Sequence, residues 1–142
     1  MITCTRKLWF CAGHRVKGHE GKCSHLHGHN YIVYVTAQAS LDSIGRVIDF
    51  SVLKDKFGSF IDDNFDHGFL VWEEDKEVID ALDYFDAYCG EQKIFVMPTN
   101  PTAENIAQFL LDNSDDILDD KGVEVTMIKV YETENCFAVA TR

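Results

Sequence analysis

The sequence predicts an α+β domain in which two pairs of strands are separated by helices. Three observations support this fold class. Residues near both ends of the chain alternate between apolar and polar side chains, the middle carries apolar residues at helical spacing, and no repeat or linker interrupts the 142 residues. The predicted order is β, β, α, a minor α, α, β, β. We therefore expect a single domain that spans residues 1–142.

Two strands are predicted in the first part of the chain. Residues 2–12 place apolar side chains on one face and polar side chains on the other, as in a half-buried strand. Residues 29–40 are rich in β-branched and aromatic side chains, which favour a second strand. Between them, residues 13–28 hold four glycines and four histidines without a clear period, and we expect a functional loop there.

The apolar period changes to that of a helix from Ser51 onward, and Ser51 is the expected N-cap. The apolar stripe of this helix consists of Leu53, Phe57, Phe60 and Ile61. A weaker and strongly acidic helix is expected over residues 76–88, followed by a brief apolar run at residues 93–97.

A better helix is predicted after Asn100, with Pro101 in its first helical position. Its buried face is supplied by Ile106, Phe109, Leu110, Ile117 and Leu118. Gly122 then breaks the helical pattern. Residues 123–131 alternate again, and residues 136–141 follow a turn-like stretch as a partner strand.

The composition is that of a soluble globular protein, with 46% hydrophobic and 26% charged residues. With 24 acidic and 13 basic residues the formal net charge is −11, which argues against DNA or RNA as a main partner. No apolar run is long enough to span a membrane, and the N-terminal residues lack the apolar core of a signal peptide. Five scattered cysteines without a C-x-x-C motif suit free thiols in a reducing cytoplasm.

A cluster of histidines indicates a metal site, because five of the six histidines lie between residues 14 and 29. His25, His27 and His29 alternate, so an extended chain places all three on one face. His14 can supply a further ligand if the two strands are antiparallel neighbours. Three imidazoles with one open position are typical of catalytic zinc. Spacing alone leaves His19 and His25 as alternatives, and the cluster could also be a solvated loop without a metal.

Cys23 and the dipeptide Asp66-His67 are candidates for acid–base or nucleophilic chemistry. A thiol close to a divalent metal and to Lys22 loses its proton more easily than a free thiol. Cys23 could instead be a fourth ligand that closes a structural site, or a passive thiol. In Asp66-His67 the carboxylate can orient an imidazole that shuttles protons, although most such dipeptides are surface residues.

Six motifs occur in an order that resembles one known family. They are Phe10-x-x-Gly-His14-Arg15, Cys23-x-x-x-His27-Gly28-His29-Asn30-Tyr31, Asp49-Phe50-x-x-Leu53-Lys54, Asp66-His67, Asn100-Pro101-Thr102-x-Glu104-Asn105 and Val130-Tyr131-Glu132-Thr133. Together they resemble the family of 6-pyruvoyl-tetrahydropterin synthase and 6-carboxytetrahydropterin synthase, over about residues 8–140.

The resemblance implies roles for individual residues. Three histidines match the zinc ligands of the family: His14, His27 and His29. Three residues match its catalytic group: Cys23, Asp66 and His67. Glu132 matches the carboxylate that anchors the pterin ring, which suits the ring because a carboxylate can accept two hydrogen bonds from an amino-pyrimidinone edge. Thr102 and Glu104 lie in a stretch that helps to line the pterin pocket.

Members of this family have the tunnelling fold, in which four antiparallel strands carry two helices on one face. Their subunits join edge to edge into barrels, commonly homohexamers built from two trimers. The resemblance therefore implies the order ββααββ, with an acidic insertion at about residues 73–92. Active sites then lie between subunits, so Asp66-His67 can serve the zinc ion of a neighbour. The exposed strand edges of a free subunit also favour assembly.

The resemblance further implies a zinc-dependent lyase whose substrate is 7,8-dihydroneopterin triphosphate. One family product is 6-pyruvoyl-tetrahydropterin, formed by elimination of triphosphate. The other is 6-carboxy-5,6,7,8-tetrahydropterin, formed with acetaldehyde on the route to 7-deazaguanines such as queuosine. Three residues separate Cys23 from His27, as in the 6-carboxy enzymes, whereas the animal pyruvoyl enzymes have a longer insertion there. This spacing favours the carboxy product.

Two alternatives remain at this point: the pyruvoyl activity, and a non-catalytic protein that binds zinc or pterin. The negative total charge requires local cations if the substrate is a triphosphate. The candidates near the motifs are Arg15, Lys17, Lys22 and Lys54. We expect neither a nucleic acid nor a membrane as partner, and we expect the cytoplasm as the location.

Overall fold

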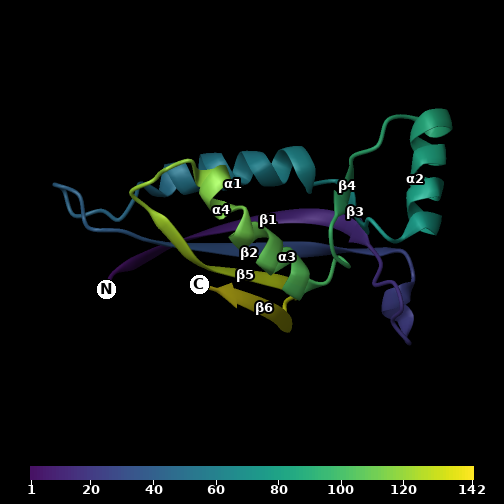
Figure 1. Ribbon diagram of the computed structural model, residues 1–142, viewed down its shortest axis with the longest axis horizontal. Helices are drawn as coiled ribbons and strands as arrows, with labels where there is room; N and C mark the ends of the chain where they lie inside the picture. The colour runs from purple at the N-terminus through teal and green to yellow at the C-terminus, as the bar shows by residue number, and fades with distance from the viewer.

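A computed structural model describes the chain from residue 1 to residue 142 and shows one mixed sheet of six strands with four α-helices (Figure 1). The strands are β1 (Thr3–His14), β2 (His27–Gln38), β3 (Gly68–Trp72), β4 (Ile94–Met97), β5 (Glu124–Thr133) and β6 (Cys136–Thr141). The helices are α1 (Phe50–Asn64), α2 (Lys76–Cys89), α3 (Ala103–Asp112) and α4 (Ser114–Leu118), together with a short 3-10 helix, η1 (Lys22–Ser24). In space the strands follow the order β4-β3-β1-β2-β5-β6.

Four antiparallel strands form the larger part of the sheet, as predicted. β1 pairs with β2 along its whole length, from Thr3 opposite Gln38 to His14 opposite His27. β2 pairs with β5, and β5 pairs with β6, both in antiparallel orientation. Along β1 every second side chain from Leu8 to His14 is buried, which confirms the alternation expected from the sequence.

The prediction of a purely four-stranded antiparallel sheet is wrong. β3 and β4 add two strands to the sheet, β3 parallel to β1 and β4 parallel to β3. The predicted acidic helix is confirmed as α2, and it is the crossover of a β-α-β unit made with β3 and β4. The two added strands have only five and four residues. Strands as short as these are too brief for a period of two to be recognised in the sequence.

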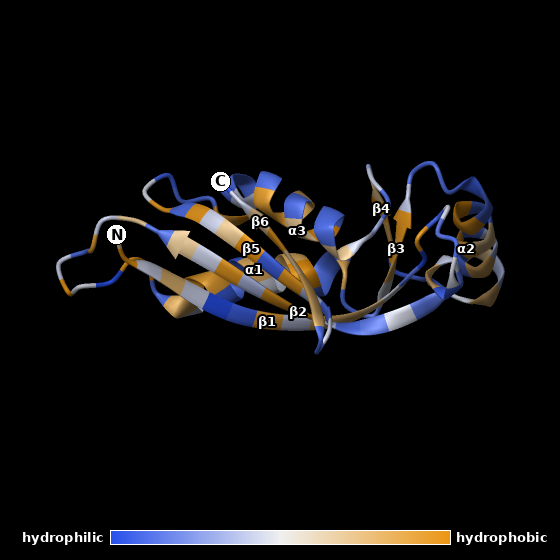
Figure 2. Cartoon of the chain, turned by 90° about the horizontal axis from the view of Figure 1, so that it is seen from below, coloured by the Kyte–Doolittle hydropathy of each residue, from blue (hydrophilic) through white to orange (hydrophobic).

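The helices α1, α3 and α4 contact the sheet and lie on one face of it (Figure 1). α1 contacts β1, while α3 contacts β5 and β6, and 23 buried residues form one apolar core between the layers. The largest fully buried side chains include those of Phe10, Tyr31, Phe57 and Phe65. On the strands, hydrophobic and hydrophilic residues alternate when the sheet is seen from below (Figure 2). Trp9 lies on the uncovered face, where its side chain is 70% exposed.

The start of α1 differs from the prediction. Its N-cap is Asp49 rather than Ser51, because the carboxylate of Asp49 accepts hydrogen bonds from the backbone nitrogen of Ser51 at 2.8 Å and from its hydroxyl at 2.7 Å. Asp49 has the extended backbone that an N-cap requires, while Ser51 is already helical.

The helix predicted after Asn100 also differs in its limits. α3 begins at Ala103 with Thr102 as N-cap, so Pro101 precedes the helix instead of occupying its first turn. The helical stretch expected to reach Leu118 consists of two helices, since α3 ends at Asp112 and α4 follows. This placement leaves the carbonyl group of Pro101 outside the helix and available to the site described below.

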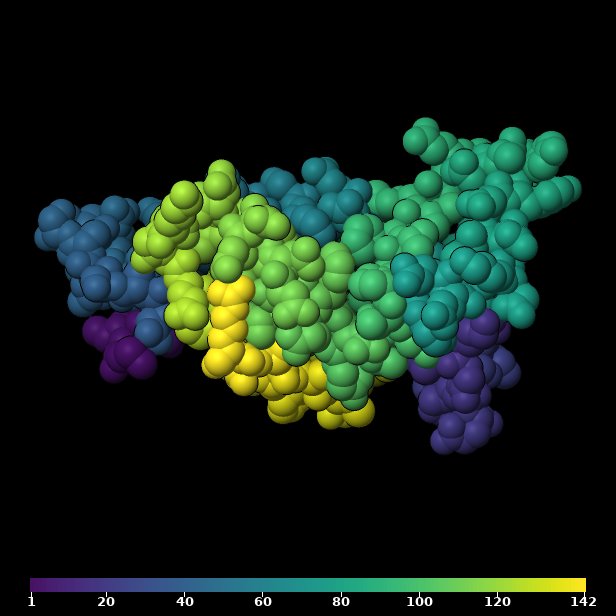
Figure 3. Space-filling view, viewed as in Figure 1, coloured from purple at the N-terminus to yellow at the C-terminus, as the bar shows by residue number.

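Two segments project at the same end of the molecule (Figure 3). One is α2 with the residues that flank it, and the other is the segment 15–26, which carries η1 between β1 and β2. None of the helices is both long enough and apolar enough to cross a membrane.

Candidate active site

Three histidines converge where β1 ends and β2 begins. His14 is the last residue of β1, and His27 and His29 are the first and third residues of β2, opposite it in the antiparallel ladder. One nitrogen of each imidazole lies within 4.8 Å of the corresponding nitrogens of the other two. The Nε2 atoms of His14 and His27 are 3.2 Å apart. The structure thus brings together the three histidines that the resemblance implies as ligands, and it leaves His19 and His25, the alternatives that spacing left open, outside the group.

Backbone carbonyls orient two of these imidazoles toward a common centre. Nδ1 of His14 lies 2.7 Å from the carbonyl oxygen of Pro101, and Nδ1 of His27 lies 2.7 Å from that of His25. Because a carbonyl oxygen only accepts, each Nδ1 must donate, and in the neutral ring each Nε2 then carries a lone pair. Two lone pairs that face each other at 3.2 Å repel, and a cation between them removes the repulsion.

The third histidine and the distances also fit a metal ion. Nε2 of His29 is buried and has no hydrogen-bond partner. Nitrogens bound to zinc at its usual Zn–N length in a tetrahedral arrangement lie about 3.3 Å apart, close to the distance between His14 and His27. Burial lowers the pKa of His14 and of His29, so both rings favour the neutral form that binds metal.

Glu132 lies beside this group. Its Oε1 atom is 3.5 Å from Nε2 of His29, and its Oε2 atom is 3.9 Å from Nε2 of His14. The side chain of Glu132 remains 25% exposed, so the carboxylate can be reached from solvent. Such a carboxylate can accept hydrogen bonds from a bound molecule or complete a metal site as a fourth ligand.

Tyr31 forms part of the floor under the histidines. Its ring stacks on Phe10 with 4.8 Å between the ring centroids and meets His14 and His29 edge-on. Its hydroxyl group is buried without a hydrogen-bond partner. Burial, together with the negative charge of Glu132, raises the pKa of Tyr31, so this hydroxyl group keeps its proton.

Cys23 is part of η1, in the projecting segment 15–26, and is half-buried. Its carbonyl oxygen accepts a hydrogen bond of 2.8 Å from the backbone nitrogen of Val16. Its thiol is not among the ligand atoms that lie together around the three histidines. The alternative in which Cys23 closes the site as a fourth metal ligand therefore finds no support in this geometry.

Asp66 and His67 form a hydrogen-bonded pair at the turn between α1 and β3. Nδ1 of His67 lies 2.7 Å from Oδ2 of Asp66, while Oδ1 of Asp66 accepts a hydrogen bond of 2.9 Å from the backbone nitrogen of Cys11. Burial acts to raise the pKa of Asp66, but these hydrogen bonds outweigh it and hold the pKa below its usual value. His67 has a left-handed backbone with φ of 57°, which is unusual for a residue other than glycine.

Cys11 is a member of this second group that sequence reasoning missed. Its thiol lies 3.6 Å from Nδ1 of His67, and its carbonyl oxygen accepts a hydrogen bond from the backbone nitrogen of His67. Cys11 and His14 are three residues apart in one strand, so their side chains point to opposite faces of the sheet. The pair of Asp66 and His67 and the three histidines therefore form two separate groups within one chain.

Thr102 and Glu104 lie next to the site along the chain but do not enter the histidine group. The hydroxyl of Thr102 accepts the capping hydrogen bond from the backbone nitrogen of Asn105 at 3.2 Å. Glu104 is exposed in the first turn of α3. Among the cations considered for a triphosphate, Arg15 already donates two hydrogen bonds to Asp75.

The sequence is similar to that of known proteins. The family model described as 6-pyruvoyl tetrahydropterin synthase matches residues 3–142. A 6-carboxy-5,6,7,8-tetrahydropterin synthase from Rickettsia typhi is 45% identical over 139 residues, which cover 96% of this chain and 98% of the relative. The enzyme of the same name from Haemophilus influenzae is 31% identical, with 96% of each chain covered.

Solved structures share the fold. An uncharacterized protein from Wolinella succinogenes superposes with a TM-score of 0.84 at 26% identity, covering 99% of this chain and 98% of its own. The 6-pyruvoyl tetrahydropterin synthase of Caenorhabditis elegans superposes with a TM-score of 0.71 at 21% identity, covering 99% of this chain and 95% of its own.

Proposed function

Because this chain belongs to the 6-pyruvoyl tetrahydropterin synthase family, we propose that it is a lyase that makes 6-carboxy-5,6,7,8-tetrahydropterin. The substrate is 7,8-dihydroneopterin triphosphate, and the other products are acetaldehyde and triphosphate. One observation carries this choice of product: relatives that bear the name of the 6-carboxy enzyme are 41% to 45% identical over 96% of the chain. The reaction belongs to the biosynthesis of queuosine and other 7-deazaguanines.

His14, His27 and His29 are the proposed zinc ligands. Three imidazole nitrogens with an open position suit zinc, and the buried unpaired nitrogen of His29 supports a metal there. A bound zinc ion supplies Lewis acidity, which lowers the pKa of the side-chain hydroxyls of the substrate. The carbonyl groups of Pro101 and His25 hold two of the rings in the tautomer that presents Nε2.

The other proposed site residues bind the substrate and move protons. Glu132 anchors the pterin ring by accepting hydrogen bonds from its amino-pyrimidinone edge. Cys23 takes a proton from the substrate side chain, and His67, oriented by Asp66, completes the proton transfers. Thr102 and Glu104 line the same pocket at the start of α3.

The complete active site is proposed to form between subunits of a homohexamer, a dimer of trimers. Cys11 and His14 point to opposite faces of one strand, so Asp66 and His67 cannot simply extend the histidine group of their own chain. A neighbouring subunit can supply them. β4 and β6 are the outer strands of the sheet, and their free edges are where further strands can join it.

The cytoplasm is the proposed location, and the pterin triphosphate is the proposed small-molecule partner. All five cysteines are unpaired, which suits a reducing compartment. The net charge of −11 disfavours a nucleic acid partner.

A product assay tests this function. Zinc-loaded protein is incubated with 7,8-dihydroneopterin triphosphate, and the products are identified by mass spectrometry. Acetaldehyde with 6-carboxy-5,6,7,8-tetrahydropterin is the expected result. Formation of 6-pyruvoyl-tetrahydropterin would instead assign the alternative activity. The Caenorhabditis elegans protein that shares this fold bears the name of that enzyme. Absence of any product would favour a protein that only binds zinc or pterin.

A further inference from the structure

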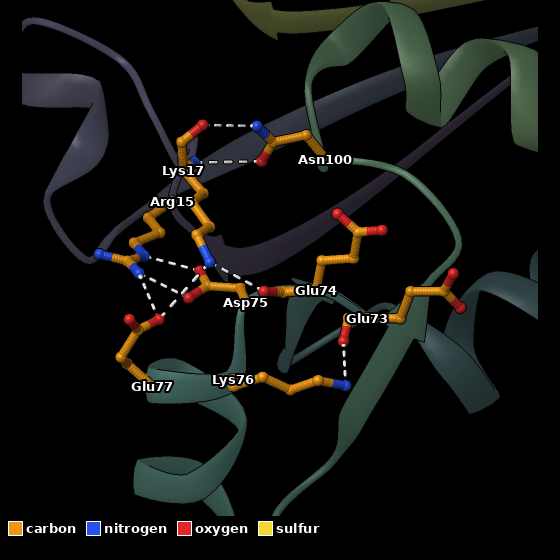
Figure 4. A network of polar contacts seen from close by, with 8 residues as sticks. All are labelled: Arg15, Lys17, Glu73, Glu74, Asp75, Lys76, Glu77 and Asn100. Carbon is orange, nitrogen blue, oxygen red and sulfur yellow. Dashed lines mark hydrogen bonds and ion pairs between the residues drawn. The ribbon is translucent and has the colours of Figure 1, made fainter.

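A polar network joins the segment that carries Cys23 to the start of α2 and to the residues before α3 (Figure 4). We propose that Asp75 and Asn100 are positioning residues that hold the Cys23 thiol in place. The β3–α2–β4 crossover then acts as a brace for this loop. The proposal rests on the catalytic role proposed for Cys23.

The first connection is the ion pair of Arg15 and Asp75. Nε of Arg15 donates a hydrogen bond of 2.7 Å to Oδ2 of Asp75, and a second guanidinium nitrogen donates to Oδ1. Asp75 is only 2% exposed, and Arg15 is 24% exposed. The hydrogen bonds from Arg15 hold the pKa of Asp75 below its usual value. Because a buried carboxylate without its partner is strongly unfavourable, this pair fixes Arg15 against the start of α2.

The second connection is between Asn100 and Lys17. The backbone nitrogen of Lys17 donates to Oδ1 of Asn100 at 3.1 Å, and Nδ2 of Asn100 donates to the backbone oxygen of Lys17 at 2.8 Å. The carbonyl oxygen of Asn100 accepts a hydrogen bond of 2.9 Å from the side chain of Asn105, which lies on α3. The ammonium group of Lys17 donates to the carbonyl oxygen of Glu74 at 2.8 Å.

Val16 transmits both connections to Cys23. It lies between Arg15 and Lys17, and its backbone nitrogen donates the 2.8 Å hydrogen bond to the carbonyl oxygen of Cys23. Since residues 15 and 17 are held on either side, the position of Val16 is fixed, and with it the end of the loop that bears the thiol. The residue after Asn100 is Pro101, whose carbonyl group orients His14. One short segment therefore positions a proposed zinc ligand and the proposed catalytic thiol together.

The acidic residues at the start of α2 differ in their contribution to this network. Glu73, Glu74 and Glu77 are exposed, whereas Asp75 is buried and paired. Glu77 makes no hydrogen bond to these cations. Its Oε2 atom lies 3.8 Å from a guanidinium nitrogen of Arg15 and 3.6 Å from Nζ of Lys17, and its side chain is 76% exposed. An exposed pair at such distances contributes little, so Glu77 offers a matched control for Asp75.

The test compares Asp75→Asn, Asn100→Ala and the control Glu77→Gln in the zinc-loaded protein. Zinc content, melting temperature, kcat and KM are measured, and the rate at which iodoacetamide alkylates Cys23 is followed by peptide mass spectrometry. We expect the two positioning variants to keep zinc, to lose about 10- to 100-fold in kcat with little change in KM, and to show faster alkylation of Cys23. The exposed Cys136 is the internal reference, and its rate should not change.

Glu77→Gln should match the unmodified protein in kcat and in alkylation rate. If Asp75→Asn does not fold, the proposal is tested with Asn100→Ala alone. That variant removes two hydrogen bonds to the backbone of Lys17 and leaves no buried charge unpaired. Unchanged kcat and an unchanged alkylation rate of Cys23 in the folded variants would overturn the proposal. Faster alkylation of Cys23 in the Asp75 and Asn100 variants, combined with full turnover of Cys23→Ala, would support the positioning of the loop by these residues. It would also exclude Cys23 from the proposed mechanism.

Discussion

The carbonyl oxygen of Pro101 lies 2.7 Å from Nδ1 of His14, although the two residues are 87 positions apart in the sequence. Pro101 is buried directly before the N-cap of α3, whereas His14 ends β1. The orientation of a proposed zinc ligand therefore depends on where α3 begins. A displaced α3 would turn the His14 ring and weaken metal binding without changing any ligand, as expected for a group that orients a metal-binding histidine.

His27→Ala should lose most of its zinc, because it removes one of the three converging imidazole nitrogens. The matched control is His25→Ala. His25 contributes only its backbone oxygen to the site, through the hydrogen bond with Nδ1 of His27, so this variant should keep its zinc. The zinc content per chain is measured by inductively coupled plasma mass spectrometry after dialysis. Full zinc content in His27→Ala would exclude the proposed ligand set.

Glu132→Gln should weaken substrate binding by about 10-fold or more while zinc content stays the same, since a neutral amide replaces an acceptor of two charge-assisted hydrogen bonds. The affinity is measured by calorimetry with a non-reacting pterin. Glu132 lies 3.5 Å from the buried nitrogen of His29, so the same variant also tests whether the carboxylate is a metal ligand. Loss of zinc would assign it to the metal, and unchanged pterin affinity would contradict the anchoring role.

The stability of the metal-free protein should fall as the pH drops below about 6.5. Burial lowers the pKa of His14 and His29 below the usual 6.5. Between the lowered and the usual pKa the unfolded chain binds more protons than the folded one, so stability is complete above that range and decreases as the pH falls through it. The carboxyl groups of Asp66 and Asp75 also have lowered pKa values, but their contribution is lost only below 3.8.

Urea unfolding of the metal-free protein at about pH 7.5 and about pH 5.5 measures this dependence. We expect a lower midpoint at the acidic pH, and a smaller difference in His29→Gln, which removes one of the two groups. Zinc should also bind more weakly at the lower pH, because protons compete for the same nitrogens. A midpoint that rises toward acid would contradict the assigned direction.

Local periodicity was sufficient to predict the four longer strands, whereas the choice of His14, His27 and His29 among the clustered histidines came from the family resemblance. His27 and His29 are two residues apart in a strand, so they share a face, and the pairing of His14 with His27 needs only that β1 and β2 are neighbours. The pair of Asp66 and His67 could likewise be proposed from the sequence because the two residues are adjacent, and the structure places Nδ1 of His67 2.7 Å from Oδ2 of Asp66.

Contacts between distant segments could not be predicted in this way. Nothing in the acidic run around Asp75 distinguishes it from its exposed neighbours, because its burial depends on Arg15, 60 residues away. Cys11 lies near His67 only because β3 pairs with β1, and β3 is too short for its period to be recognised.

Mixing two inactive variants tests whether the active site is shared between subunits. Cys23→Ala and His67→Ala should each lose turnover alone, because each removes a proposed proton-transfer group. If the thiol and the imidazole of one site come from different chains, a mixed oligomer contains sites with both groups intact. If the two variants are mixed in equal amounts and assemble at random, about one quarter of all active sites contain both groups. About a quarter of the activity of the unmodified protein should therefore return.

The two variants are unfolded together, refolded with zinc and assayed, and native mass spectrometry verifies that mixed oligomers form. The control is each variant refolded alone, which should stay inactive. Verified mixed oligomers without any activity would mean that Cys23 and His67 act within one chain. That result would contradict the proposed sharing of the active site between subunits. Recovery of activity would place the catalytic thiol of one subunit beside the acid–base pair of another.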